Sequence, residues 1–141
     1  MWIVFALLAA LLWGLNYSLA EKLLHSLSIF TLLALEMLLG AVVFSLLAGL
    51  TSFKKDWHTL SNEPNLLILT LTQVVVVSVA SYLIALSVRA KNATAAGIIE
   101  LIYPLFTIFF TWLLFRENHA NSSVLIGGTL IFIGVLIISQ G

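Results

Sequence analysis

Five apolar stretches, each about 20 residues long, constrain the fold of this chain more than any other feature of its sequence. A helix that crosses the roughly 30 Å hydrocarbon layer of a bilayer needs about 20 largely apolar residues. A lone strand cannot cross lipid, because its backbone polar groups would have no hydrogen-bond partners. The sequence therefore predicts an all-α integral membrane protein with five transmembrane helices, over residues 2–24, 29–50, 66–88, 93–115 and 124–139.

The composition agrees with lipid as the main solvent of this chain. Of the 141 residues, 62% are hydrophobic and 9% are charged, whereas a soluble domain is about half apolar and about a quarter charged. Six basic and six acidic residues balance, so no basic surface for nucleic acid is expected. We expect a single multi-pass domain over residues 1–141, surrounded by membrane lipid in the cell (inner) membrane.

The basic residues are divided evenly between the two sides of the membrane. Residues 51–65 are polar and form the only long loop that we expect. An excess of Lys and Arg in cytoplasmic loops sets the orientation of a membrane protein. Here three lie on the side of the N-terminus and three on the other, namely Lys54, Lys55 and Arg116 against Lys22, Arg89 and Lys91. Two explanations stay open: a weak bias or a partner protein fixes one topology, or the chain inserts in both orientations.

Several short motifs follow one another along the chain. They are Trp13-Gly14-Leu15-Asn16-Tyr17, Tyr82-Leu83-Ile84-Ala85-Leu86, Ala93-Thr94-Ala95-Ala96, Leu101-Ile102-Tyr103-Pro104-Leu105, Phe115-Arg116-Glu117 and the glycines from Gly127 to Gly134. In this order and spacing they resemble one EamA domain of the drug/metabolite transporter superfamily, whose first helix has a Trp-Gly-x-Asn-aromatic signature. The resemblance covers nearly the whole chain. It departs at Glu36, where such domains often have an arginine, so no role of that arginine is carried over.

The resemblance implies transport, commonly export, of small metabolites or drugs, and it implies no cofactor. Members usually hold two such domains in tandem, and a repeated unit with an odd number of spans inserts upside down, which gives an inverted repeat. This chain holds one unit. The resemblance therefore implies a pair, either an antiparallel homodimer or this chain with a paired half-size transporter. The balanced basic residues agree with the homodimer.

Two glutamates, Glu36 and Glu100, lie inside predicted spans. A carboxylate there costs on the order of 2.5–3.5 kcal/mol on insertion scales, so both should face protein or water rather than lipid. Each lies about seven residues from the end of its span on the same side, which is roughly 10 Å deep. Removal from water favours a protonated carboxyl group, so both are candidates for proton coupling. The alternative is a structural, hydrogen-bonded carboxyl group, or for Glu36 a pair with Arg89.

Further candidates follow from side-chain chemistry. Pro104 has no N–H group to bond the carbonyl of Glu100, so we predict a helix kink beside that glutamate, unless the proline is merely structural. Polar and aromatic residues are candidates either for lining a solute pathway or for interhelical packing: Trp13, Asn16, Tyr17, Gln73, Tyr82 and Tyr103. Small residues are predicted to allow close packing or dimer contacts: Ala93, Gly97, Gly127, Gly128 and Gly134.

The sequence indicates no catalytic or metal chemistry. His25, His58 and His119 lie in loops without metal-ligand spacing, so no metal site is expected. The chain has no cysteine and no nucleophile–base or phosphate-loop motif. Together with the transport that the resemblance implies, this favours a transporter of a small-molecule solute over an enzyme. The alternative is a non-transporting membrane subunit that scaffolds or regulates a larger membrane complex.

Overall fold

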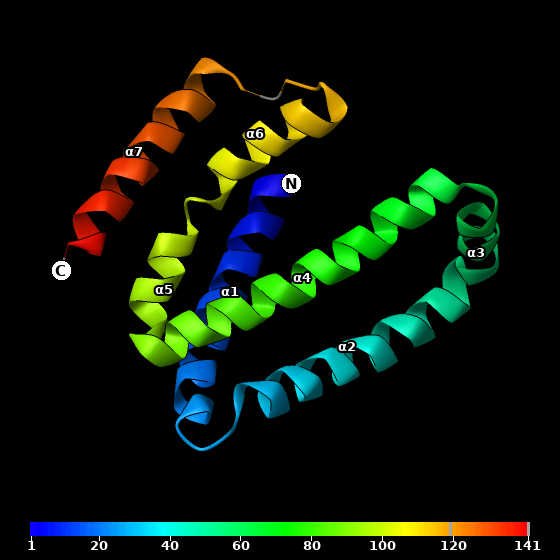
Figure 1. Cartoon of the computed structure of the whole chain (residues 1–141), viewed down its shortest axis with the longest axis horizontal. Helices are drawn as coiled ribbons and strands as arrows, with labels where there is room; N and C mark the ends of the chain where they lie inside the picture. The colour runs from blue at the N-terminus through cyan, green and yellow to red at the C-terminus, as the bar shows by residue number, and fades with distance from the viewer. Residues whose placement is uncertain (119, 141) are drawn as a thin grey trace. The chain divides into compact units, whose positions relative to one another are not determined.

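The computed structural model describes residues 1–118 and 120–140, which are helical almost throughout and contain no strand (Figure 1). Within these residues the helices are α1 (Trp2–Leu24), α2 (Ile29–Thr51), α3 (Phe53–Asn62), α4 (Pro64–Ala90), α5 (Ala93–Glu100), α6 (Tyr103–Phe115) and α7 (Ser122–Ser139). Five segments are long and apolar enough to cross a membrane, namely α1, α2, α4, the α5–α6 pair and α7. The predicted fold class, an all-α membrane protein with five spans, is confirmed.

Side-chain caps fix the start of three of the spans. The residue before the helix accepts a hydrogen bond from the backbone N–H three residues later, which satisfies a donor that a helix start leaves open. The pairs are Ser28 with Thr31 at 3.1 Å, Asn92 with Ala95 at 2.7 Å and Asn121 with Val124 at 2.9 Å. These caps place the first residues of α2, α5 and α7.

Hydroxyl groups inside the spans bond to the backbone of their own helix. Four of them donate to the carbonyl four residues earlier at 2.8 Å, namely Thr70, Thr72, Ser78 and Thr129. Lipid offers no other hydrogen-bond partner, so this bonding allows a hydroxyl group to lie in an apolar layer. The large apolar side chains are meanwhile widely exposed, which is the surface that lipid or another membrane helix would cover.

The chain divides into two compact units. Unit 1 comprises Met1–Leu19 and Ala90–Gly141, and unit 2 comprises Ala20–Arg89. In unit 1, α5 packs against α7, and the buried residues of these two helices are Ala93, Ala96, Gly128 and Val135. In unit 2, the chain runs along α2, turns through α3 and returns along α4 in the opposite direction (Figure 1). The buried residues of unit 2 are Leu24, Ile29, Leu32, Ala85 and Val88.

Residues 51–65 are largely helical, which corrects the prediction of a polar loop there. The three apolar residues Phe53, Trp57 and Leu60 recur at helical spacing, so they lie on one side of α3. The Phe53 and Trp57 rings stack with their centroids 6.1 Å apart, and Ser52 Oγ donates a hydrogen bond to the Asp56 carboxylate in the first turn. The polar residues between the apolar ones give the segment the average composition of a loop. The spacing of the apolar residues, however, is that of an amphipathic helix.

Candidate functional site

The candidate site in unit 1 is built on a hydrogen bond between two spans. The Tyr17 hydroxyl of α1 donates to Glu100 Oε2 of α5. Both side chains are half-buried. Two of the candidates from the sequence therefore lie together, and Glu100 faces another helix rather than lipid. A carboxyl group within a span is tolerated in such a position because a partner satisfies it.

A face of small residues on α5 allows this contact. Ala93, Gly97 and Glu100 recur at spacings of four and three residues, so they share one side of the helix. The Tyr17 ring lies against Gly97, and a Cβ atom added at Gly97 would come within 3.1 Å of Tyr17 Cδ2. Because position 97 has no side chain, the ring approaches the helix closely and its hydroxyl reaches Glu100, one turn further along.

Trp13 and Asn16 lie on the same side of α1 as Tyr17. The Trp13 and Tyr17 rings are tilted against each other with their centroids 5.8 Å apart. The Trp13 side chain is 59% exposed, whereas Asn16 is half-buried. The Trp-Gly-x-Asn-aromatic motif thus forms a polar and aromatic face of α1 next to Glu100.

The span that contains Glu100 is interrupted directly after this residue (Figure 1). The backbone N–H groups of Leu101 and Ile102 bond to carbonyls three residues earlier, at 3.1 and 3.3 Å, instead of four residues earlier. Pro104 lies in the first turn of α6 and cannot donate to the Glu100 carbonyl. Irregular backbone within a membrane occurs where protein or water surrounds it. The C-terminal end of α5 thus lies beside the Glu100 carboxyl group, and the partial negative charge of a helix C-terminus favours cationic groups.

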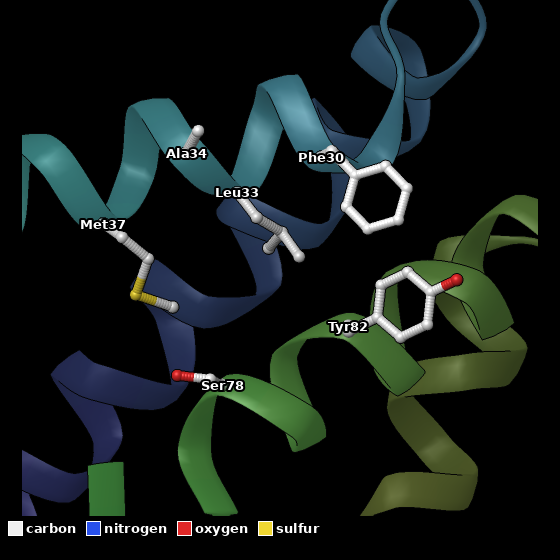
Figure 2. Close-up of a pocket in the computed structure, with 6 residues that line it drawn as sticks. All are labelled: Phe30, Leu33, Ala34, Met37, Ser78 and Tyr82. Carbon is white, nitrogen blue, oxygen red and sulfur yellow. The ribbon is translucent and has the colours of Figure 1, made fainter. Parts of the chain in front are cut away.

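Unit 2 contains a groove of about 270 Å³ between α2 and α4 (Figure 2). Its lining is almost entirely apolar and consists of Phe30, Leu33, Ala34, Met37, Ser78 and Tyr82. The Phe30 and Tyr82 rings stack with their centroids 5.4 Å apart and face each other at one end of the groove (Figure 2). Tyr82 is a candidate from the sequence, but the other five residues are not. The four lining residues on α2, from Phe30 to Met37, follow an i, i+3, i+4, i+7 spacing that is visible in the sequence, but the other sides of α2 are also apolar.

Glu36 does not line this groove, and its side chain is exposed. It shares one side of α2 with the buried residues Ile29 and Leu32 and lies one turn beyond Leu32. Glu36 is the seventh residue after Ile29, just as Glu100 is the seventh after Ala93. Arg89, the possible partner of Glu36, is exposed as well.

The remaining candidates do not gather at either position. Gln73 on α4 and Tyr103 on α6 are exposed. Gly128 of α7 is buried, and a Cβ atom there would come within 2.5 Å of Leu105 Cδ2, whereas a Cβ atom at Gly127 or Gly134 would meet nothing within 4 Å. Residues 1–118 and 120–140 hold no group of three or more His, Asp or Glu side chains that could bind a metal ion, and His119 lies outside these described residues.

Residues 1–140 match the model of the EamA-like transporter family. No curated protein and no solved structure matches the chain. The family match covers all five membrane-crossing segments, including the Trp13–Tyr17 motif and the interrupted span beside Glu100. The chain is a multi-pass membrane protein that belongs to the EamA-like transporter family.

Proposed function

We propose that this protein exports a small metabolite or drug-like solute across the cell (inner) membrane in exchange for protons. The observation that carries this proposal is the hydrogen bond between Tyr17 and Glu100, next to an interrupted span. Ionisable side chains inside spans are costly and are typical of proton relays and solute pathways. Interrupted helices near the middle of the membrane are likewise a recurring feature of transporter binding sites.

In the proposed cycle, Glu100 alternates between a proton and the solute. Tyr17 holds the carboxyl group in place through its hydroxyl group. A solute with a positively charged or hydrogen-bond-donating group competes for the same carboxylate, and its arrival releases the bond between α1 and α5. The exposed Trp13 ring offers a face for a cationic group, and Asn16 offers a hydrogen-bonding side chain beside it. Within unit 2, the groove with Phe30 and Tyr82 offers an apolar surface to hydrophobic solutes.

Several features support the assembly of two copies in opposite orientations. The matched region is one family unit, and its Lys and Arg residues are balanced between the two sides. The Glu36 side chain is exposed on a span, where only protein or water can accept a carboxyl group. Gly127 and Gly134 share one side of α7 with open space beside them, which permits the close approach of a second helix.

Solute efflux from proteoliposomes tests the proposal with a mixture of candidate solutes. Vesicles that contain the protein are loaded with a ¹³C-labelled extract of small cellular metabolites, and the outside is made acidic. We expect mass spectrometry to detect labelled solutes that leave faster than from protein-free vesicles, and only while the proton gradient lasts. Glu100→Gln should abolish this gradient-dependent efflux while the helical circular dichroism stays unchanged.

Glu63→Gln is the matched control, because it makes the same chemical change just before α4 rather than inside a span. This variant should transport like the wild type. Wild-type efflux from Glu100→Gln would remove Glu100 from the mechanism. No efflux from the wild-type protein, together with a stable complex that co-purifies in mild detergent, would instead favour the non-transporting membrane subunit.

A further inference from the structure

The helix α3 joins two membrane-spanning helices, α2 and α4. It begins two residues after the end of α2 at Thr51 and ends two residues before α4 starts at Pro64. Its 10 residues make a helix about 15 Å long, which is half the thickness of the hydrocarbon layer. Both ends of α3 therefore lie next to the ends of helices that are long and apolar enough to cross a membrane.

The two sides of α3 differ sharply in polarity. Phe53, Trp57 and Leu60 occupy one side, at i, i+4 and i+7. The Phe53 and Trp57 rings stack nearly parallel, at an interplanar angle of 20°, and 53% and 63% of these two residues are exposed. We call these three residues the aromatic face of α3. On the helical wheel, Lys55 and His58 lie on the opposite side, and Lys54 lies at the edge of the aromatic face.

We propose that α3 is a membrane-surface anchor whose aromatic face binds the boundary between lipid headgroups and acyl chains. Lipid is the occupant that the structure favours, because the chain passes into α3 directly from one membrane-crossing helix, α2, and passes from it directly into another, α4. Tryptophan concentrates at this boundary, where its ring meets apolar chains and its N–H meets the wet headgroups. Amphipathic helices with aromatic residues on one face and lysines on the other lie in the plane of the interface.

The charged residues of α3 fit the same orientation. Lys54, at the edge of the aromatic face, reaches lipid phosphates through its flexible side chain, while Lys55 extends into water. Asp56 lies at the other edge, and its carboxylate accepts a hydrogen bond from Ser52 Oγ. The anchor thereby fixes the depth in the bilayer at which α2 ends and α4 begins. The proposed solute site does not depend on this anchor.

The chain contains no cysteine, so single spin labels test this orientation cleanly. One label is placed on the aromatic face by Leu60→Cys, which leaves both rings intact. Two matched controls carry the label on the opposite side of the same helix, by Lys55→Cys and His58→Cys. The labelled proteins are reconstituted into vesicles of phosphatidylethanolamine and phosphatidylglycerol. Collisions with oxygen, which concentrates in lipid, are compared with collisions with a neutral nickel chelate, which stays in water.

We expect the ratio of oxygen to nickel accessibility to be several-fold higher at position 60 than at positions 55 and 58. Adding Phe53→Ser and Trp57→Ser to the Leu60→Cys protein should lower the ratio at position 60 to that of the controls. Equal ratios at all three positions in the protein with intact rings would overturn the proposal, because α3 would then lie in water. A label at position 60 that meets neither reagent would overturn it too, because protein would then cover the aromatic face.

This test is independent of the transport mechanism. The reagents are present on both sides of the vesicle, so the result does not depend on the orientation in which the chain inserts. Introducing Glu100→Gln into the labelled proteins should leave all three ratios unchanged. Failure of proton-coupled efflux would therefore leave the lipid anchor intact, and failure of the anchor would leave the efflux result intact.

Discussion

Replacing Tyr17 by phenylalanine removes one hydroxyl group and the hydrogen bond that it donates to Glu100. Hydrogen bonds between membrane helices average about 0.6 kcal/mol in double-mutant cycles and reach about 1.7 kcal/mol, because the unfolded chain in lipid also finds partners. We expect the bond between Tyr17 and Glu100 to lie in the upper part of that range. Its acceptor is a carboxyl group, and the ring that remains still packs against Gly97, so no cavity adds to the loss. We expect Tyr17→Phe to lower the free energy of unfolding by about 1–1.7 kcal/mol.

The assay is reversible unfolding in mixed micelles of dodecyl maltoside and dodecyl sulfate, followed by circular dichroism. A double-mutant cycle with Glu100→Leu isolates the pairwise interaction, since leucine has no acceptor. The two changes should be non-additive by about 1 kcal/mol, whereas independent sites add to within about 0.5 kcal/mol. Tyr103→Phe is the matched control. It removes a phenol hydroxyl from the same unit at a residue that is 59% exposed, and it should change stability by less than about 0.5 kcal/mol.

The reasoning is refuted if Tyr17→Phe behaves like Tyr103→Phe and the cycle is additive. Tyr17 and Glu100 would then not interact in the folded protein, and the contact between α1 and α5 would rest on Gly97 alone. A non-additive cycle without any effect of Glu100→Gln on efflux would be a different result. It would leave the bond in place and restrict it to a structural role.

Three further predictions concern packing and topology. Gly128→Leu should lower the free energy of unfolding by about 1–3 kcal/mol because the new side chain overlaps Leu105, while Gly128→Ala should cost less because only the tip of Leu105 must move. Gly127→Leu should leave the stability of the single chain nearly unchanged, since open space lies beside Gly127. If this side of α7 meets a second copy, the same variant should reduce the amount of dimer that crosslinking captures. Reporter enzymes fused to the C-terminus should signal from both sides of the membrane. Adding Asn62→Lys together with Asn118→Lys places two more positive charges on the side of Lys54 and Lys55. This variant should give signal from one side only. Signal from one side in the unaltered protein would refute dual insertion.

The membrane-crossing segments could be predicted from the sequence because their length and hydropathy are local properties. The spans at 2–24 and 29–50 are found as α1 (Trp2–Leu24) and α2 (Ile29–Thr51). The helix α3 was missed because its average composition is polar, although the spacing of Phe53, Trp57 and Leu60 could have indicated it. Glu100 and Tyr17 were both candidates, but their hydrogen bond joins residues 83 positions apart, and nothing in either segment pairs them.

The groove between α2 and α4 could not be predicted from the sequence. A helix in a soluble protein has a polar side, which reveals by exclusion the side that packs. The residues of α2 are apolar on nearly every side, so its sequence does not distinguish the side with Phe30 and Met37 from the others. Only the position of α4 beside it selects that side and brings Ser78 and Tyr82 to complete the lining.

The sequence by itself determined the number of spans, their helical form and the solvent around them. These follow from the thickness of the bilayer and from the need of each backbone to satisfy its own hydrogen bonds in lipid. Tertiary structure decided which sides of the helices meet, and it brought Tyr17 to Glu100 over Gly97. The physical reason is that apolar surface is no more favourable against protein than against lipid, so packing in a membrane depends on shape and on a few polar contacts rather than on hydrophobicity.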